Sequence, residues 1–125
     1  MRISRFVLAL CSVLLAFGAY AHAKAFRGAA FAIDNAGLAS VYAKDCKALW
    51  LADSATLGII ALFFALGAAR PSLATRLSLI AVALIPAATA VLIYTFVGPF
   101  YAGHLLLATA IAAIVAAWQF PVHAE

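Results

Sequence analysis

The sequence predicts an all-α integral membrane protein, folded as a four-helix transmembrane bundle in a single membrane domain of residues 1–125. Hydrophobic residues make up 69% of the chain and charged residues 10%, and the mean hydropathy is +1.16. A soluble domain of this size exposes too much surface to water to hide so many apolar side chains. A lipid bilayer is therefore the expected solvent and partner of the chain.

The apolar residues fall into four runs, which is the second observation behind this fold class. A helix that spans a bilayer needs about 20 residues. The last three runs are close to this length or exceed it, and the first reaches it only with its flanks. We expect spanning helices over about 3–23, 48–69, 75–97 and 99–118.

The first run has two interpretations. Arg2 and Arg5 precede an apolar centre that ends in Ala21-His22-Ala23, and such a basic start, apolar centre and A-x-A-like end are the features of a cleaved signal peptide. Residues 3–23 are also long enough to cross a bilayer. Retention gives four helices, which we favour, and cleavage of residues 1–23 gives three. The later helices are the same in both cases.

Two short breaks separate the later helices. Arg70-Pro71-Ser72 is expected to end the second helix, because proline moves the preceding residue out of the α region, and Ser72 is expected to cap the third. Gly98-Pro99 supplies a glycine stop and a proline start with almost no loop. The last two helices are therefore expected to form a tight antiparallel hairpin.

Residues 24–47 form the longest polar segment. Their apolar residues recur at steps of three and four around IDNAG, which predicts one or two short amphipathic helices on the outer membrane face. The basic residues of the short loops are balanced, so the orientation rests on Arg2 and Arg5 before the first run. The alanine-rich, leader-like start suggests a bacterial inner membrane. We expect a cytoplasmic C-terminus, and a cytoplasmic N-terminus if the first helix is retained.

Small residues are expected to face the interior of the bundle. Apolar side chains gain little by leaving lipid, so membrane helices associate where small residues let their backbones approach closely. Such residues recur at helical spacing in each of the last three runs. The predicted interior stripes are Ser54, Gly58, Ala61, Ala65 and Ala68; Ala83, Ala87, Ala90 and Tyr94; and His104, Ala108, Ala112 and Ala116.

One group of polar residues is a candidate site. Asp53 and His104 are the readily ionisable residues within the runs, and such residues in a membrane helix are costly and often functional. In the expected topology they lie at one depth in the outer leaflet, as partners, with Tyr94 and Ser54 nearby. These four residues form a candidate ligand or proton site. The alternative is structural, with Asp53 at the positive end of a helix dipole and His104 bonded to a neighbouring helix.

The sequence assigns no catalytic residue, cofactor or metal site. His22 and His104 are weak candidate metal ligands. A site at His104 would need His22 as a further ligand, and cleavage of a leader would remove His22. The basic residues flank apolar runs instead of forming a recognition surface, so we expect no nucleic-acid partner. Neither a nucleophile elbow nor a phosphate-binding glycine loop is present.

The scarcity of polar groups favours a non-enzymatic accessory or interaction protein, whose alanine stripes pack against a second copy or a larger membrane protein. Two alternatives stay open. One is an oligomeric small-solute or proton-linked carrier that uses the Asp/Tyr/His site in the outer leaflet. The other is a membrane redox or lipid-modifying enzyme that binds a quinone, a haem or an acyl substrate.

Overall fold

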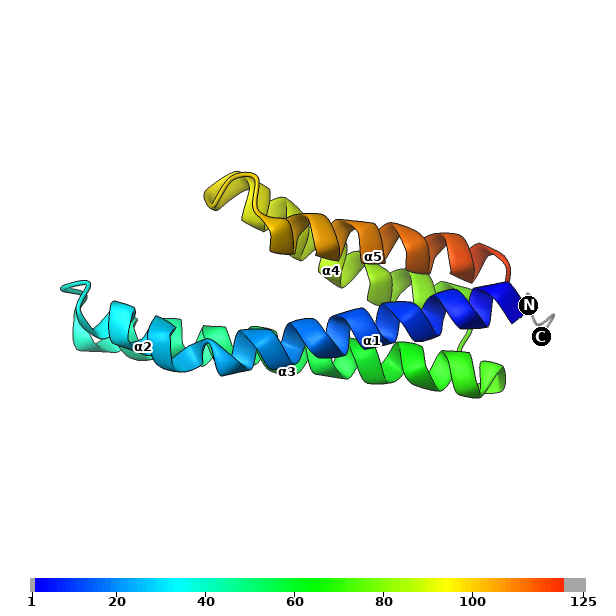
Figure 1. Ribbon diagram of the computed structural model, residues 1–125, viewed down its shortest axis with the longest axis horizontal. Helices are drawn as coiled ribbons and strands as arrows, with labels where there is room; N and C mark the ends of the chain where they lie inside the picture. The colour runs from blue at the N-terminus through cyan, green and yellow to red at the C-terminus, as the bar shows by residue number, and fades with distance from the viewer. Residues whose placement is uncertain (1, 121–125) are drawn as a thin grey trace.

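The computed structural model describes residues 2–120, and in these residues the fold is helical, with no strand (Figure 1). Met1 and residues 121–125, which the expected domain of 1–125 includes, lie outside the described part. The all-α, four-helix prediction is confirmed, since four of the helices are long and apolar enough to cross a membrane. The elements are α1 (Arg2–Lys24), α2 (Phe26–Asp34), α3 (Ser40–Ala69), the 3₁₀ turn η1 (Pro71–Leu73), α4 (Arg76–Phe96) and α5 (Tyr101–Trp118).

The four long helices form two antiparallel hairpins. Helix α1 packs along α3, and α4 packs along α5. The main contact between the hairpins is α1 against α5, while α3 and α4 touch much less. Figure 1 shows the hairpins close together where α1 begins and α5 ends, and apart at the α4–α5 turn. Helix α1 therefore lies between α3 and α5 and forms the main link between the hairpins.

Buried residues of α1 form part of the core. Leu8, Cys11 and Leu15 are each at most 2% exposed. The Ser12 hydroxyl donates to the Ala61 carbonyl of α3 at 2.7 Å. The Ser4 hydroxyl donates to the side-chain oxygen of Gln119, just beyond α5, at 2.9 Å. Hydrogen bonds thus join α1 to α3 and to the end of α5. Such bonds supplement packing between helices in lipid.

Large apolar side chains cover the outside of the bundle. Ile59, Leu84, Val91, Ile111 and Val115 are each more than half exposed. Such a surface would be unfavourable in water but suits contact with lipid chains. The chain is a multi-pass membrane protein by the length and composition of its helices.

The predicted interior stripes are only partly correct. In α3, Ser54, Ala61 and Ala68 are buried as expected, and so are Ala83 and Ala90 in α4. The large residues between them were expected to face lipid, yet Leu57, Ile60 and Phe64 are buried too. Small residues bring backbones close at some levels, and large side chains fill the space between helices at the others.

The stripe predicted for α5 is wrong in phase. His104 and Ala108 are exposed, and Ala112 is only half-buried. Only Ala116 of the predicted stripe is buried as expected. The buried face of α5 carries Gly103, Leu106, Thr109, Ala110, Ala113, Ala116 and Ala117. An alanine-rich helix has small residues on every face, so residue size alone does not fix which face turns inward.

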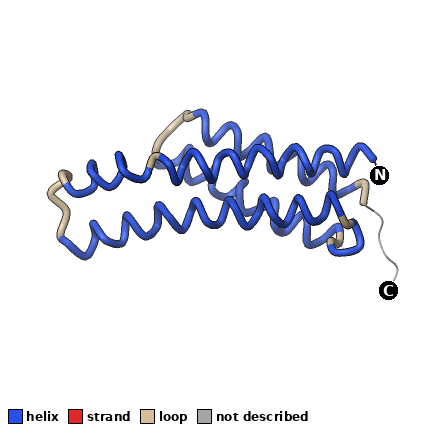
Figure 2. The backbone as a smooth tube through the Cα atoms, turned by 60° about the horizontal axis from the view of Figure 1, so that its bottom comes forward, coloured by secondary structure: helices blue, strands red, loops and turns tan. Residues whose placement is uncertain are grey.

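The helix ends have specific partners. Thr75, not Ser72, caps α4: its hydroxyl accepts from the Ser78 backbone N–H at 3.1 Å, and the Ser78 hydroxyl accepts from the Thr75 N–H at 3.0 Å. This capping box satisfies two backbone donors that a helix start leaves free. Ser72 lies in η1 instead. Gly98 lies in the tight α4–α5 turn with φ of +91°, a conformation that glycine adopts at little cost. Short loops join the helices throughout (Figure 2).

The segment 24–47 contains one short helix, α2, where one or two were expected. Helix α2 follows α1 after a break at Ala25, and residues 40–47 are the first turns of α3. No glycine or proline interrupts α3 before Gly58, so the helix starts well before the apolar run. Helix α2 packs along this extension, and the Lys47 ammonium donates to the Asp34 carboxylate at 2.6 Å.

Candidate functional site

A cleft of about 640 Å³ lies between the two hairpins near the end where they diverge. All four long helices line it, and most of the lining side chains are apolar. The polar residues at its wall are concentrated where α1 ends and α3 enters its apolar run. The lining includes Phe17, Ala21, His22, Trp50, Asp53, Leu57, Thr89, Leu92, Ile93, Phe100, Leu105 and Leu106.

Trp50 holds His22 in place by two contacts. The imidazole and indole rings stack with centroids 4.2 Å apart and planes inclined by 11°. The indole Nε1 also donates to the His22 carbonyl at 2.9 Å. That carbonyl lies in the last turn of α1, where helices leave backbone acceptors without intrahelical partners. The end of α1 at Lys24 therefore provides the acceptor that fixes Trp50.

His22 also contacts two residues of α3. Its Nδ1 lies 2.8 Å from the Ser54 hydroxyl, and its Nε2 lies 3.7 Å from a carboxylate oxygen of Asp53. The side chains of His22 and Asp53 are 28% and 39% exposed, so they are accessible from the cleft. The stacked ring and the hydroxyl together fix which nitrogen faces Asp53.

The hydrogen bond of Ser54 decides which nitrogen of His22 carries the ring proton. Ser54 has one hydroxyl proton and two acceptors in reach, His22 Nδ1 and the Trp50 carbonyl at 3.3 Å. If Nδ1 accepts it, Nε2 carries the ring proton toward Asp53. If the Trp50 carbonyl accepts it, Nδ1 donates to Ser54, and Nε2 is an acceptor beside the carboxylate. The pair can therefore offer a proton, or a hydrogen bond, to a group in the cleft.

Tyr94 and His104 form a second, separate pair. The Tyr94 hydroxyl lies 2.8 Å from His104 Nδ1, with ring centroids 5.4 Å apart. Neither residue lines the cleft. A Cβ atom on Gly103 would lie 2.9 Å from the Tyr94 ring. Glycine at 103 therefore lets α5 approach α4 closely beside this pair.

The structure divides the four predicted site residues between two places. Asp53 and Ser54 lie together at the cleft, and Tyr94 and His104 lie together on the α4–α5 hairpin. In the described part of the chain no hydrogen bond or ion pair joins Asp53 to His104, although they were expected to be partners. Similar depth in the membrane did not bring them together, because His104 is on an exposed face of α5.

His22 and Trp50 are the site residues that the sequence analysis missed. His22 was considered only as a weak metal ligand, and its place depended on whether the first run is cleaved. Trp50 has the appearance of an ordinary interfacial aromatic residue, which is the usual role of tryptophan at a helix end. The pairing of α1 with α3 gives both residues their partners.

The arrangement suits binding an amphipathic molecule. Within residues 2–120 no three His, Cys, Asp or Glu side chains lie close enough together to hold a metal ion. His22 and His104, the two weak candidate ligands, belong to different pairs. The cleft instead offers apolar walls to a hydrocarbon group and one polar corner to a head group, which is the usual composition of a small-molecule site.

No protein-family model, curated protein or solved structure matches this chain. The chemistry of the cleft therefore carries the functional argument.

Proposed function

We propose that this chain is a non-enzymatic binding protein of the bacterial inner membrane, which holds an amphipathic small molecule in the cleft between its hairpins. The observation that carries the proposal is the cleft itself, about 640 Å³ in volume, with apolar walls and His22 and Asp53 at one corner. A ligand with a compact polar head and an apolar tail matches both parts. An isoprenoid quinone or a single-chain lipid is of this kind.

The polar corner is suited to recognition more than to turnover. The Trp50 stack and the Ser54 hydroxyl hold the His22 ring in one orientation. Its other nitrogen, Nε2, is then the polar group that a ligand in the cleft can meet. Recognition of a carbonyl or hydroxyl head requires one such group. The neighbouring wall residues Leu57, Leu92 and Leu106 would contact the tail.

A proton-linked carrier is the second candidate function, and the His22–Asp53 pair favours it. A carboxylate and an imidazole side by side inside a membrane helix bundle are typical of proton-relay sites. A single four-helix protomer has little room for a pathway, so this function requires a homo-oligomer. A protein that is strictly monomeric in gentle detergent would exclude the carrier and leave the binding function in place.

The proposal includes an orientation. We infer that α1 is retained, because removal of residues 1–23 would take Leu8, Cys11 and Leu15 out of the core and would remove His22 from the cleft. Arg2 and Arg5 favour a cytoplasmic start of α1. The cleft then opens in the outer half of the membrane, and the C-terminus is cytoplasmic.

Trp50 provides a direct test of binding. The chain has two tryptophans, so Trp118→Phe leaves Trp50, which lines the cleft, as the sole tryptophan. We expect decylubiquinone, an amphipathic probe whose ring quenches tryptophan, to quench Trp50 saturably. Native mass spectrometry of the protein extracted from its own membrane would then identify the natural occupant.

A matched pair of variants makes the test specific. Ala21 lines the cleft and Ala16 does not, and both are exposed residues of α1. We expect Ala21→Phe to abolish saturable quenching and Ala16→Phe to leave it unchanged. Equal quenching in both variants, or quenching that never saturates, would mean that the probe meets Trp50 only from the lipid phase and would overturn the proposal.

A further inference from the structure

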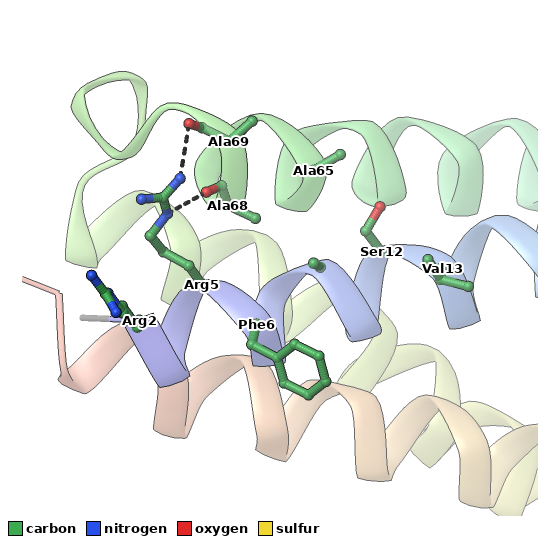
Figure 3. A pocket seen from close by; sticks show the side chains of 9 residues that line it. Arg2, Arg5, Phe6, Ser12, Val13, Ala65, Ala68 and Ala69 are labelled. Carbon is green, nitrogen blue, oxygen red and sulfur yellow. Dashed lines mark hydrogen bonds between the residues drawn. The ribbon is translucent and has the colours of Figure 1, made fainter.

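A second cavity, about 520 Å³ in volume, lies at the opposite end of the bundle from the cleft. It is a groove between the first turns of α1 and the last turns of α3, with Arg2 and Arg5 at one end (Figure 3). Ala9 and Ala65 line it farther along, together with Phe6 and Val13. Phe6 and Val13 are 71% and 64% exposed, so the groove lies on the outer surface of the bundle, where lipid would be.

The arginine end of the groove carries positive charge that no described acidic residue neutralises. The first turn of α1 contains no acidic residue, although the positive end of the helix dipole is there. Both ion pairs in residues 2–120 lie elsewhere, at His22–Asp53 and Lys47–Asp34. An anion is therefore the favoured ligand at this helix start.

Arg5 is fixed in place by the helix end opposite it. Its Nε donates to the Ala68 carbonyl at 2.7 Å, and its Nη2 donates to the Ala69 carbonyl at 3.3 Å (Figure 3). These carbonyls belong to the last turn of α3, which lacks intrahelical donors. The guanidinium is thus held at the groove entrance in a set orientation, with its Nη1 group and the exposed Arg2 left for an outside ligand.

We propose that this groove binds an anionic phospholipid, with its phosphate on Arg2 and Arg5 and one acyl chain along Ala9 and Ala65. Basic pockets between membrane helices are a known chemistry for anionic lipid head groups. The arginine end of the groove adjoins its apolar part. One molecule with a phosphate and a hydrocarbon chain can therefore bind the arginines and fill the apolar part at once. A free phosphate ion would leave the groove beyond Phe6 unoccupied.

Native mass spectrometry of the full chain in detergent tests this proposal. With equal amounts of dioleoyl phosphatidylglycerol and dioleoyl phosphatidylcholine added, we expect preferential retention of one phosphatidylglycerol. Arg2→Gln should lower that preference about fivefold, since one basic residue near an anionic head group contributes about this much. Ala9→Phe should reduce retention of phosphatidylglycerol without changing the charge.

Each variant has a matched control. Arg70 lies at the same end of the bundle but does not line the groove, and neither does Ala16 of α1. Arg70→Gln and Ala16→Phe should leave the preference unchanged. Circular dichroism of every variant checks that the helices have formed. We expect Arg2→Gln to fold, because Arg2 is an exposed residue of the first turn.

Three results would overturn the inference. Equal losses in Arg2→Gln and Arg70→Gln would reduce the effect to general surface charge. Equal retention of both lipids by the unaltered protein would remove the head-group preference. Displacement of the lipid by glycerol phosphate at the same concentration would identify a free phosphate ester as the ligand. None of these results bears on decylubiquinone binding at the cleft, so the two proposals fail independently.

Discussion

His22 of α1 stacks on Trp50 of α3 with ring centroids 4.2 Å apart, and the same indole donates to the His22 backbone carbonyl. This double contact ties the end of the first spanning helix to the second. It also orients the imidazole toward Asp53.

The first prediction concerns this contact. His22→Ala removes the ring stack and the bond to Ser54, so it should lower the free energy of unfolding by about 1–2 kcal/mol. Unfolding in mixed micelles with increasing dodecyl sulfate, followed by circular dichroism, measures the change. His104→Ala is the control, since His104 is exposed and bonds only to Tyr94 among the described residues; an equal loss there would contradict a special role for His22.

The second prediction concerns Ser12 in the middle of α1. Its buried hydroxyl donates to the Ala61 carbonyl at 2.7 Å. Ser12→Ala should cost about 0.6 kcal/mol of stability, the average for hydrogen bonds between membrane helices. Thr56→Ala is the matched control, because Thr56 bonds within its own helix to Ala52. The prediction fails if the two variants unfold at the same dodecyl sulfate fraction.

The third prediction compares two helical glycines. Gly103→Ala places a Cβ atom 2.9 Å from the Tyr94 ring, so α4 and α5 must separate or the ring must move. We expect a destabilisation of about 1–3 kcal/mol from this overpacking. A Cβ atom on Gly58 meets nothing within 4 Å, so Gly58→Ala should be neutral or stabilising by up to about 1 kcal/mol. Thermal aggregation midpoints in detergent would rank the two.

The fourth prediction concerns the arginine at the end of α3. Arg5→Lys keeps the charge but cannot donate to both the Ala68 and Ala69 carbonyls in the same fork geometry. We expect a loss of about 1 kcal/mol. Hydrogen exchange should quicken in the last turn of α3, and Arg70→Lys should have no such effect. Unchanged exchange in Arg5→Lys would mean that these carbonyls do not depend on the guanidinium.

The fifth prediction is the retention of α1. The purified chain should contain residues 2–23, with an intact mass near 13.0 kDa when nothing else is changed. Peptides from the first helix should be recovered after digestion. A mature chain that begins at Lys24 would contradict the prediction, and it would also remove His22 from the cleft.

The sequence predicts the helices better than it predicts the contacts between them. The length of each apolar run and the breaks at Pro71 and Gly98 are local properties, so they can be read directly. The cap is a local property too, but residue type ranks Ser72 ahead of Thr75. Only the position of η1 decides between them.

The candidate site depended on facts that are not local. Asp53 and Ser54 were identified because polar residues are rare in the apolar runs. Their partner His22 lies about thirty residues earlier, across the α1–α3 hairpin, and its register depends on the lengths of α2 and its turn. Likewise, nothing in the composition of α5 indicates that His104 faces outward and Gly103 inward, because alanine occurs on every side of that helix.

The bond between Ser4 and Gln119 joins residues 115 positions apart, so assembly of the bundle cannot finish until synthesis is almost complete. Until then the first helix can pair with α3 but lacks its α5 neighbour. The stack of His22 on Trp50 needs only α1 and α3, and both precede α5 in the chain. The first helix is thus the element whose packing spans the whole of synthesis, from its early partner α3 to its last partner just beyond α5.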